Sequence, residues 1–492
     1  MTSRDQLPET PATTGELAPR RVEIYSCLDD QDTLIRGDPV REAVMRRWFY
    51  RSSLLLATVT ATVAAATLPA LACGEDGPDG AAPKVTGSPG AEKNVKAVGN
   101  VPDAQGAISL GFLQYGDRDV MYVSGQFGLR TYDLTDNPAA PKPLGQLSMP
   151  GLWETEDTQV DPVHKLAFLA RDPRAFNGNT DTGESGVYIV DLADPANPTT
   201  LSYVKVPAGH TTRCINDCQY LWTQGPAKAD DQPADWGGRP IWVTDISNPR
   251  EPKVFPDPID LARNDGKTDY VHDVQVDETG IAWASGRGGV RGYWTTGTHN
   301  DPLTGQQREA TATDPVPYAG GGIAETAAPS RFMHNSFRPI GSRAKDGGGA
   351  GRFADGDLIY VTEENFAPGC ADDGVLVIAS LEGSYDGEGW RSTPDQPYRL
   401  TTVGTWGVAG QEGSDPASDD CSAHYFDVQD KILVQSFYAQ GTRFLDVSDP
   451  TNPQQIAYYR PADARSWAPY WHRGLVYVAD NTRGIDILQL TA

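Results

Sequence analysis

The chain has 492 residues, 39 % of them hydrophobic, and a formal net charge of −25 at pH 7. This acidity argues against a nucleic-acid partner, because proteins that bind nucleic acids need a basic surface to displace counterions. The 51 glycines and 38 prolines favour many short strands and turns over helices.

The N-terminal region is predicted to be a targeting signal rather than part of the fold. Basic residues at 46, 47 and 51 precede an apolar run over residues 54–71, which is short for a transmembrane helix. The run ends in Ala70-Leu71-Ala72-Cys73, which resembles the lipobox of bacterial lipoproteins. We therefore expect residues 45–73 to be an export signal with lipidation at Cys73; the alternative is plain signal-peptidase cleavage nearby.

The segments on either side of this signal are predicted to lie outside the folded domain. Residues 1–44 are polar and unpatterned, so either Met45 is the true start or the extension is disordered. Arg46-Arg47-Trp48-Phe49 also resembles a twin-arginine motif, which leaves the export route open between that pathway and Sec. Residues 74–93, rich in Gly, Pro, Asp and Ala, are predicted to form a flexible tether.

The rest of the chain repeats one pattern of strands. Short runs of aromatic and β-branched residues begin at seven positions: Val120, Leu166, Tyr220, Ile281, Leu358, Ile432 and Leu475. A further strand-like run precedes each of them, another follows, and the clear repeats then show an Asp–Pro corner and a fourth run. Four strands repeated seven times predict an all-β fold, a seven-bladed β-propeller spanning residues 94–492.

The corner is predicted to be structural. It reads YDLTDNPAAP from Tyr132, VYIVDLADPANP from Val187, IWVTDISNP from Ile241 and FLDVSDPTNP from Phe444. Proline cannot donate to a strand ladder, so it stops the third strand, and the preceding Asp or Asn can hold the turn by bonding nearby backbone.

The ring is predicted to close by pairing the two ends of the propeller. The last repeat, GIDILQLTA, stops after its third strand, and residues 94–102 are expected to supply the fourth, which removes an exposed sheet edge. The predicted blades are residues 103–155, 156–209, 210–270, 271–331, 332–419, 420–466, and 467–492 with 94–102.

These motifs resemble a known family. VYIVD followed by LADPANP is similar to the LVIVD repeat of bacterial cell-surface β-propeller proteins, and the likeness covers essentially the whole mature chain. The fourth and fifth repeats depart from it, with the long insertions GYWTTGTHNDPLTG and LVIASLEGSYDG. The resemblance implies a propeller outside the cytoplasm, here in the cell envelope, and implies no particular activity.

Four cysteines in the propeller are predicted to form two disulfides, as suits an oxidising compartment. Cys214 and Cys218 flank a turn between two strand-like runs, where opposed Cβ atoms lie about 4.5–5.5 Å apart. The rival assignment, a C-x3-C metal clip, lacks a second cysteine pair. Cys370 lies in a long loop and Cys421 lies beside His424, so a bond between them would brace that rim.

Four of the seven histidines occupy equivalent positions, at the start of the first strand in repeats three to six: His210, His272, His334 and His424. First strands line a propeller's channel, so these imidazoles are expected around one channel mouth. Converging imidazoles are good ligands for iron, copper or zinc. The alternative is that each histidine caps a strand and bonds the neighbouring blade. His164 and His472 are interpreted as exposed turn residues, and His299 falls in an insertion.

Two functions are therefore open. The first is a lipid-anchored binding or scaffold protein that presents long loops to a surface protein or small ligand. The second is an extracytoplasmic metal-dependent oxidoreductase that uses the four histidines. In either case we expect a monomer whose only membrane contact is the lipid anchor.

Overall fold

The computed structural model describes residues 90–149, 156, 158–172, 184–225, 240–259, 271–286, 289–301, 304–319, 332–340, 353, 356–365, 370, 373–381, 400–418 and 420–491. All of them belong to one compact unit. The predicted extension, export signal, Cys73 and most of the tether lie outside the described residues. No helix among the described residues is long and apolar enough to cross a membrane.

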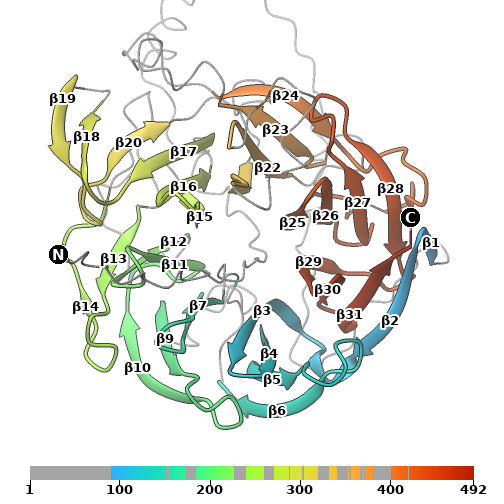
Figure 1. Ribbon diagram of the computed structural model, residues 1–492, viewed down its shortest axis with the longest axis horizontal. Helices are drawn as coiled ribbons and strands as arrows, with labels where there is room; N and C mark the ends of the chain where they lie inside the picture. Colours follow the sequence, from blue (N-terminus) through green and yellow to red (C-terminus); the bar gives the residue numbers. More distant parts are fainter. Residues whose placement is uncertain are drawn as a thin grey trace, which may run out of the picture. The chain divides into compact units, whose positions relative to one another are not determined.

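The strands form seven antiparallel sheets arranged in a ring, which confirms the predicted seven-bladed propeller (Figure 1). Blade one contains β3 (Ala107–Tyr115), β4 (Arg118–Gly125), β5 (Gly128–Asp133) and β6 (Lys142–Leu147). Blade two contains β7 (Gln159–Asp161), β8 (Leu166–Arg171), β9 (Gly186–Asp191) and β10 (Thr199–Lys205). Blade three contains β11 (Thr211–Ile215), β12 (Tyr220–Gln224), β13 (Trp242–Asp245) and β14 (Lys253–Val254).

The remaining blades follow the same order. Blade four contains β15 (Val271–Val276), β16 (Ile281–Gly286), β17 (Gly289–Trp294) and β20 (Val316–Ala319), with an inserted hairpin of β18 (Thr298–Asp301) and β19 (Gln306–Glu309). Blade five contains β21 (Phe332–Phe337), β22 (Leu358–Glu364), β23 (Leu376–Ser380) and β24 (Thr401–Trp406). Blade six contains β25 (Phe426–Gln429), β26 (Ile432–Ser436), β27 (Thr442–Asp446) and β28 (Gln454–Arg460). Blade seven contains β29 (Ser466–His472), β30 (Leu475–Asp480), β31 (Gly484–Leu490) and β2 (Val95–Val101).

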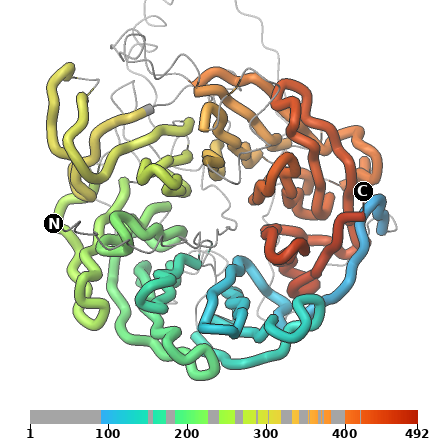
Figure 2. The backbone as a smooth tube through the Cα atoms, viewed as in Figure 1, coloured from blue at the N-terminus to red at the C-terminus, as the bar shows by residue number. Residues whose placement is uncertain are grey.

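Ring closure occurs as predicted. Strand β2 pairs antiparallel with β31, from Val95 opposite Leu490 to Val101 opposite Ile485, and a short 3₁₀ helix, η2 (Pro102–Ala104), leads into blade one. The blue N-terminal segment therefore lies beside the red C-terminal strands (Figure 2). The tether prediction is wrong for its last residues, because β1 (Ala91–Lys93) forms a fifth strand on the edge of β28.

The hydrophobic core lies between neighbouring blades. Leu113 and Leu129 of blade one pack with Val160 and Leu169 of blade two, and similar buried clusters join each later pair of blades. Each sheet thus buries apolar side chains on both faces, which explains the nearly continuous apolar runs of the second strands.

The Asp–Pro corners hold both a turn and a blade interface. In blade six, Asp446 Oδ1 accepts from the Ser448 amide at 2.8 Å and Asp449 Oδ1 from the Thr451 amide at 3.0 Å, and the other three corners show the same paired turns. The corner also packs on the preceding blade, where a Cβ added to Gly404 would lie 2.0 Å from the Pro450 carbonyl oxygen. The corner is therefore structural, as predicted.

Both predicted disulfides are present. Cys214–Cys218 spans the turn between β11 and β12, and Cys370–Cys421 joins the loop after β22 to the segment that leads into β25.

Candidate metal centre

The four equivalent histidines lie together at the inner ends of their blades. His210 precedes β11, His272 and His334 lie within β15 and β21, and His424 precedes β25. Successive imidazole centroids are 4.7, 4.2 and 4.2 Å apart, so the rings form a continuous row, called here the histidine row. All four are at most 1 % exposed, so the row is buried among the described residues. Its place at one mouth of the channel stays a prediction.

Two of the imidazoles are held by the next blade in a defined orientation. His272 Nδ1 lies 2.9 Å from the His334 carbonyl oxygen, and His424 Nδ1 lies 2.9 Å from the Trp467 carbonyl oxygen. Because a carbonyl only accepts, each Nδ1 carries the hydrogen, and Nε2 of the neutral ring keeps its lone pair. One nitrogen thus bonds the neighbouring blade, as the capping alternative requires. The other nitrogen of His272 lies 2.9 Å from His210 Nε2, and that of His424 has no hydrogen-bond partner among the described residues.

Some imidazole nitrogen atoms of the row are buried and make no hydrogen bond. Among the described residues, His424 Nε2 and both ring nitrogens of His334 are buried without a hydrogen-bond partner. Such groups are rare in folded proteins, and each costs about 1–3 kcal/mol of stability. Strand capping does not account for them.

Three buried acidic side chains approach the row, and the sequence analysis missed all of them. Glu156 Oε2 lies 3.1 Å from His210 Nε2, 3.4 Å from His272 Nε2 and 4.0 Å from His334 Nε2. Asp172 Oδ2 is 3.3 Å from His210 Nδ1, and Glu364 Oε1 is 3.9 Å from His424 Nε2. Glu156 comes from a loop. Asp172 and Glu364 are each the seventh residue counted from the start of a second-strand run, at Leu166 and Leu358, so they occupy matching repeat positions that were not singled out in the sequence.

Two sets of three side chains have the spacing of a metal site. Glu156, His272 and His334 form one, and His334, Glu364 and His424 form the other, each with its ligand atoms within 4.8 Å of one another. His334 belongs to both. A third set, Cys370, Asp373 and Cys421, contains the disulfide, so its sulfurs are already bonded.

The surroundings keep the imidazoles of His272, His334 and His424 neutral. Burial, reinforced by the neighbouring imidazoles, lowers the pKa of His272 and His334 well below the ordinary value, and burial lowers the pKa of His424 to about 3. Neutral imidazole is the form that binds metals.

Aromatic rings cover the row at the His424 end. The Tyr425 ring lies 4.5 Å from His334 and 4.7 Å from His424, and the Tyr438 ring lies 4.7 Å from His424. Phe332 packs 5.0 Å from His272. These rings place the nitrogen atoms in a dry, low-dielectric environment, where electrostatic interactions are stronger than in water.

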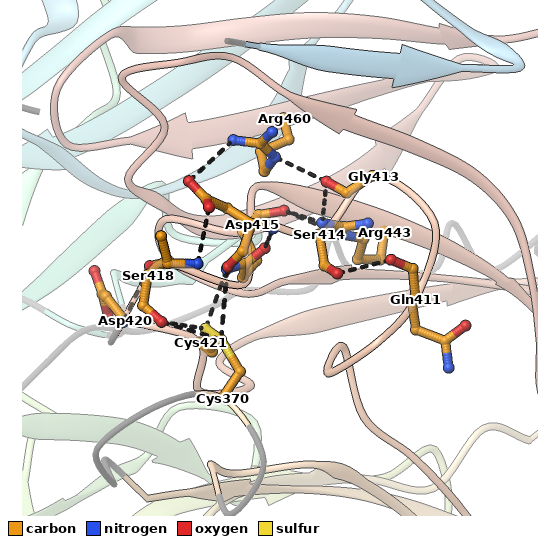
Figure 3. Close-up of polar contacts among 12 residues, drawn as sticks. Cys370, Gln411, Gly413, Ser414, Asp415, Ser418, Asp420, Cys421, Arg443 and Arg460 are labelled. Atoms are coloured by element: carbon orange, nitrogen blue, oxygen red, sulfur yellow. Dashed lines mark hydrogen bonds and ion pairs between the residues drawn. A yellow bond between two sulfur atoms is a disulfide. The ribbon is translucent and has the colours of Figure 1, made fainter. Parts of the chain in front are cut away.

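The Cys370–Cys421 disulfide braces this end of the row (Figure 3). The Cys421 amide donates to Asp373 Oδ2 at 2.9 Å, and Gln440 Nε2 donates to Cys421 Sγ at 3.1 Å and to the Asp415 carbonyl at 2.9 Å. Arg460 extends the network to Asp415. The brace therefore ties the loop that follows Glu364 to the segment that carries His424.

The other three histidines lie apart from the row. His164 is an exposed turn residue, as predicted, and His299 lies on the inserted strand β18. The interpretation of His472 as an exposed turn residue is wrong, since its side chain is 22 % exposed, stacks on Phe112 and pairs with Asp119 at 2.8 Å across the closure of blades seven and one.

Comparisons with known proteins bear on the fold alone. No family model matches the chain, and no curated protein matches it. A periplasmic gluconolactonase of Pseudomonas aeruginosa is similar at 12 % identity, with 71 % of this chain and 85 % of that chain covered and a TM-score of 0.44. A putative 6-phosphogluconolactonase of Bacteroides uniformis matches at 11 % identity, over 75 % and 92 % of the two chains, with a TM-score of 0.47. Hydrazine synthase of Kuenenia stuttgartiensis matches at 11 % identity, over 76 % and 94 %, with a TM-score of 0.41.

Proposed function

We propose that this protein is an extracytoplasmic metalloprotein whose histidine row binds a transition metal that serves an oxidoreductase reaction. The observation that carries the proposal is the set of buried nitrogen atoms without a partner on His334 and His424. A metal that accepts one lone pair from each imidazole would offset the cost of burying those two nitrogen atoms without hydrogen bonds.

The donor set and its spacing fit a first-row metal. The ligand atoms of Glu156, His272 and His334, and those of His334, Glu364 and His424, all lie within 4.8 Å of one another in each set. Imidazoles suit iron, copper and zinc, and the nearby glutamates offset the charge of the cation.

The metal's identity decides the reaction class. Iron or copper would supply redox chemistry, whereas zinc would act only as a Lewis acid or as a source of hydroxide. In each case the protein's part is to orient the imidazoles through the His334 and Trp467 carbonyls and to exclude water with its tyrosines.

We further propose a location in the cell envelope, with a lipid anchor at Cys73, for a protein of the LVIVD type. The supporting features are the lipobox-like residues 70–73, the repeated corner motif and two disulfides, which persist in oxidising compartments.

The other function, a surface binding or scaffold protein, stays a prediction. It depended on long loops after the second strands, and residues 173–183, 226–239 and 366–369 of those loops lie outside the described residues.

His334→Leu tests the metal proposal, with His164→Leu as a control at an exposed histidine. We expect about one equivalent of transition metal in the exported wild-type protein and in the control, and almost none in His334→Leu. The metal-free variant should be as stable as the metal-free wild type, or more so by about 1–3 kcal/mol, because two orphaned nitrogens are removed.

Elemental analysis and thermal unfolding give both readouts. A wild type without metal, together with a destabilised His334→Leu variant, would instead assign the row a purely structural role.

A further inference from the structure

The two potential ligand sets differ in how their polar atoms are satisfied. At the Glu156 end, the Nε2 atoms of His210 and His272 contact each other at 2.9 Å, and Glu156 lies within 3.4 Å of both. The two Nε2 atoms can therefore bond each other without a ligand. At the Glu364 end, His334 and His424 Nε2 have no hydrogen-bond partner among the described residues. Of the four Nε2 atoms in the row, the two without a partner are therefore those beside Glu364 in the second ligand set.

Glu364 is held in place by a constrained tyrosine. The Tyr438 hydroxyl donates to Glu364 Oε1 at 2.6 Å, and its ring packs on His424. Tyr438 has a φ of +40°, close to the left-handed region that side chains other than glycine rarely adopt. Its carbonyl oxygen accepts from the Gly441 and Ser466 amides, both at 3.0 Å, which fixes the residue between blades six and seven.

Backbone strain of this kind persists only where the surrounding structure enforces it, and it clusters at functional sites. Here the strained conformation presents the hydroxyl to a carboxylate beside two nitrogen atoms without partners.

We propose that Glu364 is an anionic metal ligand alongside His334 and His424, and that Tyr438 is a positioning residue that holds its carboxylate. The inference rests on the proposed function and names the ligand set within the row. Two histidines and one carboxylate with open positions are typical of non-haem Fe(II) sites that activate oxygen. The structure therefore points to ferrous iron as the resident metal and to dioxygen as a co-substrate.

Tyr425 provides a matched comparison for Tyr438. Both tyrosines are fully buried, and both rings lie 4.7 Å from His424. Only Tyr438 bonds Glu364, whereas the Tyr425 hydroxyl has no partner among the described residues. Removing each hydroxyl in turn therefore separates the bond to Glu364 from the packing of an aromatic ring.

The test is a titration of the metal-free full chain with Co²⁺ under anaerobic conditions, followed by its visible absorption bands. The variants are Glu364→Gln, Tyr438→Phe, Tyr425→Phe and Glu156→Gln. We expect Glu364→Gln to lose tight binding and Tyr438→Phe to bind about 10–100-fold more weakly with shifted bands. Tyr425→Phe should match the wild type, and Glu156→Gln should lose less affinity than Glu364→Gln.

The outcomes separate this inference from the proposed function. A wild type that binds no Co²⁺ contradicts both. A wild type that binds Co²⁺ contradicts only the inference if Glu364→Gln binds equally well, or if Glu156→Gln loses more. Equal spectra and affinities for Tyr438→Phe and Tyr425→Phe would remove the positioning role of Tyr438. Thermal unfolding of each variant establishes that it is folded.

Discussion

The outer rim and the inner axis of this propeller both carry residues that repeat from blade to blade, but the repeats have different physical consequences. At the rim, Asp446 and Asp449 each accept a backbone amide, and the corner they form packs on the preceding blade. At the axis, His334 and His424 bring nitrogen atoms into the interior that gain no bond there.

The comparison shows that repetition alone does not distinguish structure from function. What distinguishes them is whether the repeated polar group is satisfied where the fold places it. The corner aspartates are satisfied locally, so stability explains them. The histidine row is satisfied only in part, so it calls for a ligand.

Removal of the two disulfides should produce the largest changes in stability, and it tests whether the histidine row depends on the loop held by Cys370–Cys421. Replacing both Cys370 and Cys421 by Ser should lower the free energy of unfolding by about 4 kcal/mol, and the Cys214/Cys218 pair by about 2 kcal/mol, because a longer loop is released in the first case. The sequence separations are 51 and 4 residues. Chemical denaturation measures both values.

Metal binding should separate the two disulfides further. The Cys370–Cys421 brace holds the segments that carry Glu364 and His424, so its loss should weaken metal binding, whereas loss of Cys214–Cys218 should leave it unchanged. Equal metal affinities in the two double variants would show that the row does not need this brace.

Gly404→Ala should disturb the packing of an Asp–Pro corner at the outer rim and leave the histidine row unchanged. The added Cβ would meet the Pro450 carbonyl oxygen at 2.0 Å, so the corner of blade six must shift, at a cost of about 1–3 kcal/mol. In the control Gly407→Ala, the nearest atom is on the Val375 side chain at 2.9 Å, which can adjust more easily. Both variants should keep the metal content of the wild type. A loss of metal in Gly404→Ala would mean that rim and axis are coupled.

Substitution of Asp119, which lies where blades seven and one meet, should give the smallest change in the free energy of unfolding. Burial alone would raise the pKa of Asp119, but the hydrogen bonds and charges of His472 and Arg473 hold it below its ordinary value of 3.8. The folded-state pKa is thus depressed, so the stabilisation is fully present above pH 3.8 and is lost as the pH falls through the folded-state value.

Asp119→Asn should therefore cost about 1 kcal/mol near neutral pH, as for other partly exposed charged pairs. The difference from the wild type should shrink below about pH 4. Thermal unfolding of both proteins across this range measures the difference, and an offset that does not change with pH would contradict the assignment.

The fold could be predicted from the sequence because it consists of repeated blades that share sequence motifs. The apolar runs recur in all seven blades and the Asp–Pro corner recurs in four of them, and the incomplete last repeat predicts the closing strand β2. The histidines were found for the same reason, since they recur at the start of successive first strands.

The rest of the site was not predicted. Glu156 reaches the row only through tertiary structure, whereas Glu364 and Tyr438 share one repeat position, the seventh residue counted from Leu358 and from Ile432, where the residue type differs between blades. Glu364 ends strand β22, LIYVTEE, whose first four residues are apolar and whose last three are buried polar residues. The role of Tyr438 could not be predicted, because it depends on a backbone conformation and on a residue 74 positions away.

X-ray absorption at the metal edge of the exported wild-type protein tests the central claim most directly. We expect a bound iron atom with a first shell of imidazole nitrogen and carboxylate oxygen at about 2.0–2.2 Å, and the multiple-scattering pattern of at least two imidazoles. A metal without imidazole scattering, or no metal at all, would contradict the account.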